Sequence, residues 1–194
     1  YALFKGAHVR TMAIDIPSEG KVTISLGMSC MDYEDASTPF VTSTKPVSDT
    51  PFVSSISVGT ILVDGESLEG QACISGLTLN IDNNLQTQRC LGSGKLGPGA
   101  LIETTADITG TVTMAWSKRS WEIWKNQMTR KPIALEFPIR DSLGNEYVFS
   151  LPAVEVDGEL PNGGKTDLLE VTLNYTVAKE APTITRKAAT TSEP

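Results

Sequence analysis

The chain has 194 residues, of which 40% are hydrophobic and 20% charged, and it carries a net charge of −7. These values fit a single globular domain with a core, and they exclude a chain too polar to fold. Scattered lysines and arginines argue against tight DNA binding, which needs clustered cations. No apolar run is long enough to span a bilayer.

Two runs of alternating apolar and polar residues begin the chain, at 10–16 and 22–28. Alternation of this kind is typical of a strand with one face on a core. Pro17 and Gly20 lie between the runs and suit a turn, because proline presets φ and glycine accepts positive φ. The sequence therefore predicts an antiparallel hairpin over residues 8–29. Its second strand is expected to bury Val22, Ile24, Leu26 and Met28.

Residues 31–55 break this pattern, because they are rich in Ser, Thr, Pro and Asp and keep no period. A loop of this length inside a compact domain is usually either functional or disordered. One interpretation is a mobile surface excursion. The other is an arm that becomes ordered when it docks on a neighbouring subunit.

Strand patterns return at residues 56–62 and 77–82. A glycine-rich stretch at 91–99 follows them, but it lacks the order of a phosphate-binding loop and no helix comes after it. We interpret this stretch as a connector between strands.

One short helix is predicted over residues 117–130. Ser117 or Ser120 can cap its N-terminus, and Pro132 ends it. Trp121, Trp124 and Met128 have the spacing i, i+3 and i+7 and share one helix face, so we expect them to pack against the core.

The C-terminal third alternates clearly at residues 133–139 and 147–151, with a Gly144-Asn145 turn between the two runs. The last strand, 169–177, alternates over its whole length. From Ala178 the chain is polar and without pattern, so residues 179–194 are predicted to be a flexible C-terminal tail. The fold class is therefore mainly β, an antiparallel β-sandwich with one short α-helix and a long Ser/Thr/Pro-rich loop.

Residues suited to catalysis or metal binding do not converge in the sequence. His8 has no partners at metal-ligand spacing, and the three cysteines (Cys30, Cys73 and Cys90) are odd in number and widely spaced, which favours reduced thiols. Acidic residues gather at 32–35 and 64–69, in polar, turn-like sequence. We therefore expect no metal, no cofactor and no enzymatic activity.

Residues 6–20, GAHVRTMAIDIPSEG, resemble the opening of the tail tube proteins of long-tailed bacteriophages. Residues 108–113, the helix, and residues 135–152 resemble later parts of the same family in the same order. The resemblance covers most of residues 6–177, and its strength lies in the order of these pieces.

The resemblance implies a tail-tube-like barrel over residues 1–178, a structural protein of the virion whose copies form rings stacked into a tube. The rings would have six-fold symmetry, or trimeric pseudo-six-fold symmetry as in relatives with two tandem domains. A chain that begins at Tyr1 is also compatible with the second half of such a protein. Assembly in the host cytoplasm, contacts with the tape-measure, tail tip and terminator proteins, and passage of DNA without specific binding are further implications. A related tube of bacterial secretion systems shares the fold.

The resemblance also assigns candidate residues. The 31–55 segment would be the loop between rings, with candidates Asp32, Tyr33, Glu34, Asp35, Phe40, Lys45 and Phe52. The polar strand faces would line the lumen, with candidates Thr23, Ser25, Ser29, Thr78, Asn80 and Asp82. An alternative function from another class is a carbohydrate- or receptor-binding β-sandwich of a tail tip or surface adhesin. Aromatic residues are only 6% of the chain, so the signal for sugar stacking is weak.

Overall fold

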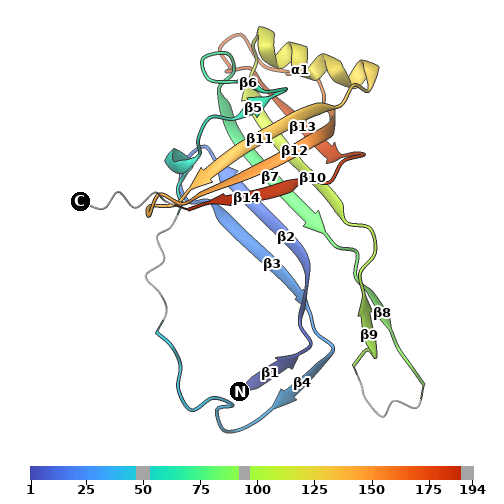
Figure 1. Ribbon diagram of the computed structural model, residues 1–194. Helices are drawn as coiled ribbons and strands as arrows, with labels where there is room; N and C mark the ends of the chain where they lie inside the picture. The colour runs from blue at the N-terminus through green and yellow to red at the C-terminus, as the bar shows by residue number, and fades with distance from the viewer. Residues whose placement is uncertain (47–52, 92–96, 189–194) are drawn as a thin grey trace. The chain divides into compact units, whose positions relative to one another are not determined.

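A computed structural model describes residues 1–46, 53–91 and 97–188, and most of its elements are antiparallel strands (Figure 1). The largest sheet has the strand order β3-β2-β7-β10-β13-β12-β11-β5-β6, with β14 also paired to β12. Two smaller sheets are β1-β4 and β8-β9. The predicted fold class, mainly β with one helix, is confirmed. The strands are β1 (Ala2–Lys5), β2 (His8–Pro17), β3 (Thr23–Ser29), β4 (Asp32–Asp35), β5 (Leu62–Val63), β6 (Glu66–Ser67), β7 (Ile74–Asp82), β8 (Gln86–Gln88), β9 (Ala100–Ile102), β10 (Asp107–Ala115), β11 (Ile133–Arg140), β12 (Glu146–Asp157), β13 (Glu170–Val177) and β14 (Thr183–Lys187).

The chain divides into two compact units by its contacts. Unit 1 contains residues 1–13, 24–50 and 80–107, and unit 2 contains residues 14–23, 51–79 and 108–194. Strands β2 and β7 each contribute residues to both units. The single domain over residues 1–178 stays a prediction.

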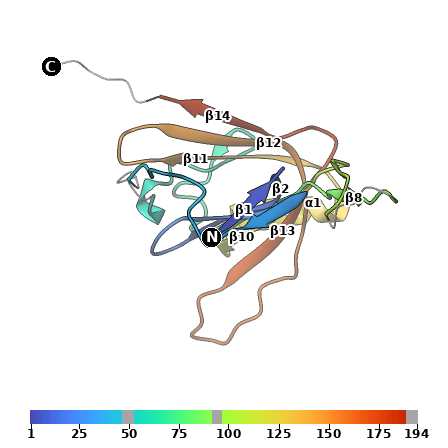
Figure 2. The same cartoon turned by 90° about the horizontal axis from the view of Figure 1, so that it is seen from below.

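Unit 2 is a two-layered β-structure. Figure 2 shows β11, β12 and β14 in one layer and β10 and β13 in the other. Strand β12 takes part in both, because it pairs with β11, with β14 and, through its last residues, with β13. Apolar residues of every layer face inward, as in a sandwich. The innermost side chains include Phe137, Leu151, Val154, Val171, Leu173 and Tyr175.

The β11–β12 hairpin has the turn that the sequence predicts. Asp141 accepts hydrogen bonds from the backbone amides of Leu143 and Asn145, and Gly144 has a φ of 85°. The register that follows places Phe137 opposite Phe149, and their rings stack with centroids 5.0 Å apart. Local turn chemistry thus sets the pairing of two core aromatic residues.

The helix also forms where the sequence predicts it. Helix α1 (Lys118–Thr129) starts after Ser117, whose side chain accepts a hydrogen bond from the Ser120 amide, while the Ser120 hydroxyl accepts one from the Ser117 amide. Arg130 ends the helix in the left-handed conformation.

Three sequence predictions of local structure need correction. Residues 32–35, expected within a loop, form β4 and pair with β1. Residues 183–187, expected in a flexible tail, form β14 and pair with β12. Residues 55–57, in a region expected to be a strand, form a short 3₁₀ helix, and regular pairing there is limited to β5. Strands β4 and β14 form because they pair with strands distant in sequence, and residues 55–57 do not form a strand because no such partner is present among the described residues. The pattern of nearby residues does not predict such pairing.

Candidate assembly surfaces

Unit 2 has a polar sheet face rich in threonine, formed by β7, β10, β13 and β12. Thr111 on β10 lies opposite Asn174 on β13, and Thr113 lies opposite Thr172. Hydroxyl groups join the strands, with Oγ1 distances of 2.9 Å for Thr78–Thr111 and 3.0 Å for Thr113–Thr172. We call this set the threonine face, and its members are Thr78, Thr109, Thr111, Thr113, Glu155, Asp157, Glu170, Thr172, Asn174 and Thr176.

The charged groups of the threonine face are all carboxylates. Glu155 lies opposite Thr176, Asp157 lies opposite Asn174, and Glu170 lies opposite Ala115. All three acidic residues are exposed, and none of the ten members of the face is a lysine or arginine. Such a surface repels phosphate and offers no cation for it to bind.

A tyrosine on the opposite face supports the same three strands. Tyr175 is buried, and its hydroxyl donates a hydrogen bond to the Thr78 carbonyl on β7. Gly110 of β10 lies opposite Tyr175, and a Cβ atom built there would be 2.1 Å from the Thr78 oxygen and 2.4 Å from the phenol ring. Burial raises the pKa of Tyr175. The ring therefore crosses β10 where only glycine leaves room for it.

The predicted lumen residues have different environments. Thr78 belongs to the threonine face through its bond to Thr111. Asn80 is exposed, and Asp82 accepts a hydrogen bond from the Asn84 amide; both continue β7 within unit 1. On β3, Thr23 and Ser25 are exposed and Ser29 is half-buried. Their role at a lumen stays a prediction.

The sequence did not identify the threonines of β10 as candidate lumen residues, although they alternate with apolar residues. The pairing of β10 with β13, which places these threonines on one face, is not visible in the sequence.

Unit 1 has almost no core. Among its described residues, Leu85 is the only buried one. Twenty-five hydrophobic residues are buried in the described chain, so nearly all of the core belongs to unit 2. Burial of apolar area is the main favourable term in folding, and unit 1 therefore gains little stability from its own contacts.

Strand β3 presents apolar side chains to solvent. Ile24, Leu26 and Met28 are 60%, 56% and 52% exposed, so the prediction that this face packs on the core is wrong. The alternation was real, but the described chain places nothing over the apolar side. Strand β3 is also the last strand in the sheet order, and its outer edge has no partner strand among the described residues.

The β1–β4 ribbon has one aromatic and one charged face. Phe4 lies opposite Tyr33, and both are more than 60% exposed. On the other face the Lys5 ammonium pairs with the Glu34 carboxylate, which raises the pKa of Lys5 mainly through that hydrogen bond. A two-stranded ribbon with every residue exposed is marginally stable alone.

The remaining inter-ring candidates follow this ribbon. Asp32 and Asp35 lie on β4, opposite Lys5 and Ala2. Phe40 is 37% exposed, Lys45 is exposed, and Phe52 lies outside the described residues. Their contact with a second ring stays a prediction.

The tryptophan prediction for α1 is correct for one of its three residues. Trp124 is buried and donates a hydrogen bond to the Gly158 carbonyl at 2.9 Å. Trp121 is 40% exposed and stacks on Trp124 with ring centroids 5.0 Å apart. Met128 is 65% exposed and does not pack in the core. The helix instead buries Ile123, which precedes Trp124 and falls outside the predicted stripe.

Several of the acidic residues considered for catalysis have structural partners. Asp64 accepts a hydrogen bond from the Ala134 amide, and Glu66 pairs with Arg119 at 2.9 Å. His8 lies 3.9 Å from Glu103. Across residues 1–46, 53–91 and 97–188, no three His, Cys, Asp or Glu side chains are placed to hold a metal ion, and the three cysteines are free thiols. Within the same ranges, no helix has the length and hydropathy needed to cross a membrane.

Comparison with known proteins identifies the family. A search of curated proteins returned no match. A family model described as "Phage tail tube protein" matches residues 1–177, which include all of unit 1, most of unit 2 and every element except β14. This match makes the protein a structural component of the virion tail. The chain belongs to the phage tail tube protein family.

Proposed function

We propose that copies of this chain form closed rings, of six-fold or trimeric pseudo-six-fold symmetry, that stack into a hollow tube for genome delivery. The observation that carries this proposal is the state of unit 1, which has an open edge strand, an exposed apolar face on that strand and a single buried residue. Covering Ile24, Leu26 and Met28 would contribute on the order of 3 kcal/mol per subunit. A neighbouring copy that pairs with the edge of β3 extends the sheet around the ring, and side chains of a neighbouring copy that pack over its apolar face supply that cover.

The threonine face is the candidate for the lumen wall. Its hydroxyl, amide and carboxylate groups are well hydrated and carry no positive charge. DNA and the tape-measure protein then pass without specific binding, because phosphate finds no cation on the wall. Tail tip and terminator proteins are the partners at the two ends, and assembly takes place in the host cytoplasm.

Electron microscopy of the purified protein over a concentration series tests the proposal. Wild-type protein is expected to form rings or hollow filaments whose symmetry can be counted. Leu26→Asp places a charge in the proposed interface and is expected to abolish assembly. Ser25→Asp places the same charge on the opposite face of β3 and is expected to assemble. Equal assembly by both variants would remove β3 from the interface.

The second candidate function is carbohydrate binding by the β1–β4 ribbon, because Phe4 and Tyr33 present an exposed aromatic pair. A protein that stays monomeric at every concentration and binds glycans through these two rings would support it. Loss of assembly on Phe4→Ala without any glycan affinity would support the tube instead.

A further inference from the structure

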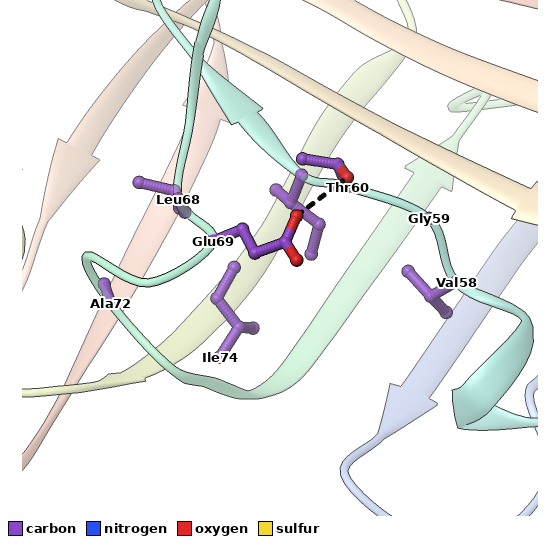
Figure 3. Close-up of a pocket in the computed structure, with 8 residues that line it drawn as sticks. Val58, Gly59, Thr60, Leu68, Glu69, Ala72 and Ile74 are labelled. Atoms are coloured by element: carbon purple, nitrogen blue, oxygen red, sulfur yellow. Dashed lines mark hydrogen bonds between the residues drawn. The ribbon is translucent and has the colours of Figure 1, made fainter.

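Unit 2 carries an apolar groove beside β7 that no part of the described chain fills. Two adjoining cavities of about 330 Å³ and 100 Å³ share Val58, Ile61 and Ile74 as lining residues (Figure 3). The larger one continues to Leu68 and Ala72, and the smaller one continues along β7 to Leu77. About half of the lining residues are aliphatic, and serine, threonine and glutamate side chains lie among them, so the groove suits an extended segment with both apolar and polar side chains.

Gly76 lies beside the smaller cavity, on the strand face that also carries Thr78. A Cβ atom built on this residue would meet no other atom within 4 Å, so a side chain fits there without a clash. Gly76 is in the interior of a strand, where glycine weakens pairing and often marks close approach of another backbone. A backbone that approaches β7 at this point therefore meets no side chain.

Glu69 is the only charged residue that lines the groove. Figure 3 shows its carboxylate at the Thr60 side chain, whose hydroxyl donates to it at 3.5 Å. Glu69 forms no ion pair with any residue that the structure describes. An apolar groove with one unpaired carboxylate at its side favours a segment with apolar side chains and one cation.

Residues 37–46 of the chain have this composition. Phe40 and Val41 are 37% and 59% exposed, and Lys45 is the only charged residue between positions 36 and 46. Residues 37–46 make no hydrogen bond or ion pair with the described chain and belong to no strand or helix. The segment therefore has a partly exposed Phe40, an exposed Val41 and a cation without an ion pair, while the groove has aliphatic side chains and a carboxylate without an ion pair.

We propose that the groove receives residues 40–45 of a second copy, with Phe40 and Val41 in its apolar part and Lys45 paired with Glu69. This inference rests on the proposed tube and names the receiving surface of its contact between copies. Each copy offers one groove and one segment, so the contact is head-to-tail and propagates along a stack.

Zero-length cross-linking on assembled protein tests the pairing directly. Subunits labelled with ¹⁵N are mixed with an equal amount of unlabelled subunits before assembly and then treated with a carbodiimide. Amide bonds between Lys45 and Glu69 are expected, about half of them joining a labelled to an unlabelled chain, as random mixing requires. Lys45–Glu69 products that never mix labels would show that the segment occupies its own groove and would overturn the proposal.

Variants test the groove independently. Thr60→Tyr fills the larger cavity from an exposed position and is expected to lower the assembled fraction by about tenfold while the monomer keeps its Tm. Asn162→Tyr, on an exposed loop, is the matched control. Glu69→Lys and Lys45→Glu are each expected to weaken assembly, and the double variant to restore it. Normal assembly of both Thr60→Tyr and Glu69→Lys would overturn the groove and leave the tube intact. Wild-type protein without multimers at any concentration would contradict the proposed function itself.

Discussion

The hydroxyl group of Tyr175 on β13 reaches the backbone carbonyl of Thr78 on β7, two strands away, by crossing β10 at Gly110. This bond ties together the three strands that carry the threonine face on their other side. A buried residue thus fixes the spacing of the exposed threonines, and its removal is expected to show in the stability of the fold.

Gly110→Ala is expected to destabilise the protein by about 2 kcal/mol or more, because the added methyl group meets the Thr78 carbonyl and the Tyr175 ring at once. Gly76→Ala is the matched control, since both glycines lie in strand interiors and a Cβ at Gly76 meets nothing. Urea unfolding of the two variants measures the difference. Equal midpoints would show that β10 moves aside easily at this position.

Tyr175→Phe removes the hydroxyl and leaves the ring, and its cost is expected to be about 1 kcal/mol, the usual net value of one hydrogen bond. The wild type is also expected to lose stability above about pH 10. Burial raises the folded pKa of Tyr175 above its unfolded value, so the unfolded state releases the proton first. The contribution of Tyr175 to the free energy of unfolding is fully present below the pKa of the unfolded state and is lost as the pH rises toward the pKa of the folded state. Unfolding curves from pH 8 to 11 should show a smaller decline for Tyr175→Phe.

Strand β14 is expected to detach in acid. Arg140 and then Lys187 hold the pKa of Glu146 below its ordinary value, and Lys187 is the last residue of β14. A lowered folded pKa means that the contribution to stability is present above the unfolded pKa and disappears as the pH falls through the folded one.

Hydrogen exchange of residues 183–187 measures that detachment. Protection is expected at pH 7 and is expected to fall toward pH 3, whereas Glu146→Gln should show weak protection at both values. Unchanged protection in Glu146→Gln would mean that backbone pairing with β12 alone holds the strand.

The helix should tolerate change at one predicted position and not at another. Trp124→Ala removes a buried indole and its bond to Gly158, with an expected cost of about 3–5 kcal/mol. Met128→Ala changes an exposed side chain and should stay within about 0.5 kcal/mol of the wild type. Thermal unfolding separates the two outcomes. A large loss of stability in Met128→Ala would show that Met128 packs against the core, as the sequence predicts.

Patterns within short stretches of the sequence predicted local structure correctly. Alternation in residues 133–139 and 169–177, the Asp141–Asn145 turn and the Ser117 cap each depend on neighbours within a few residues, and all appear in the structure as expected. Which apolar faces are buried depends on contacts between distant segments. Leu26 and Leu173 have the same alternating context, yet β13 packs inside unit 2 and β3 stands at an open edge.

The threonine face and β14 also could not be predicted from local sequence patterns. Thr78, Thr111 and Thr172 form one surface only because β7, β10 and β13 pair across long sequence separations. Residues 183–187 carry no strand pattern and are ordered by the edge that β12 offers them. Pairing and burial are properties of contacts between distant segments, and periodicity within one segment does not contain them.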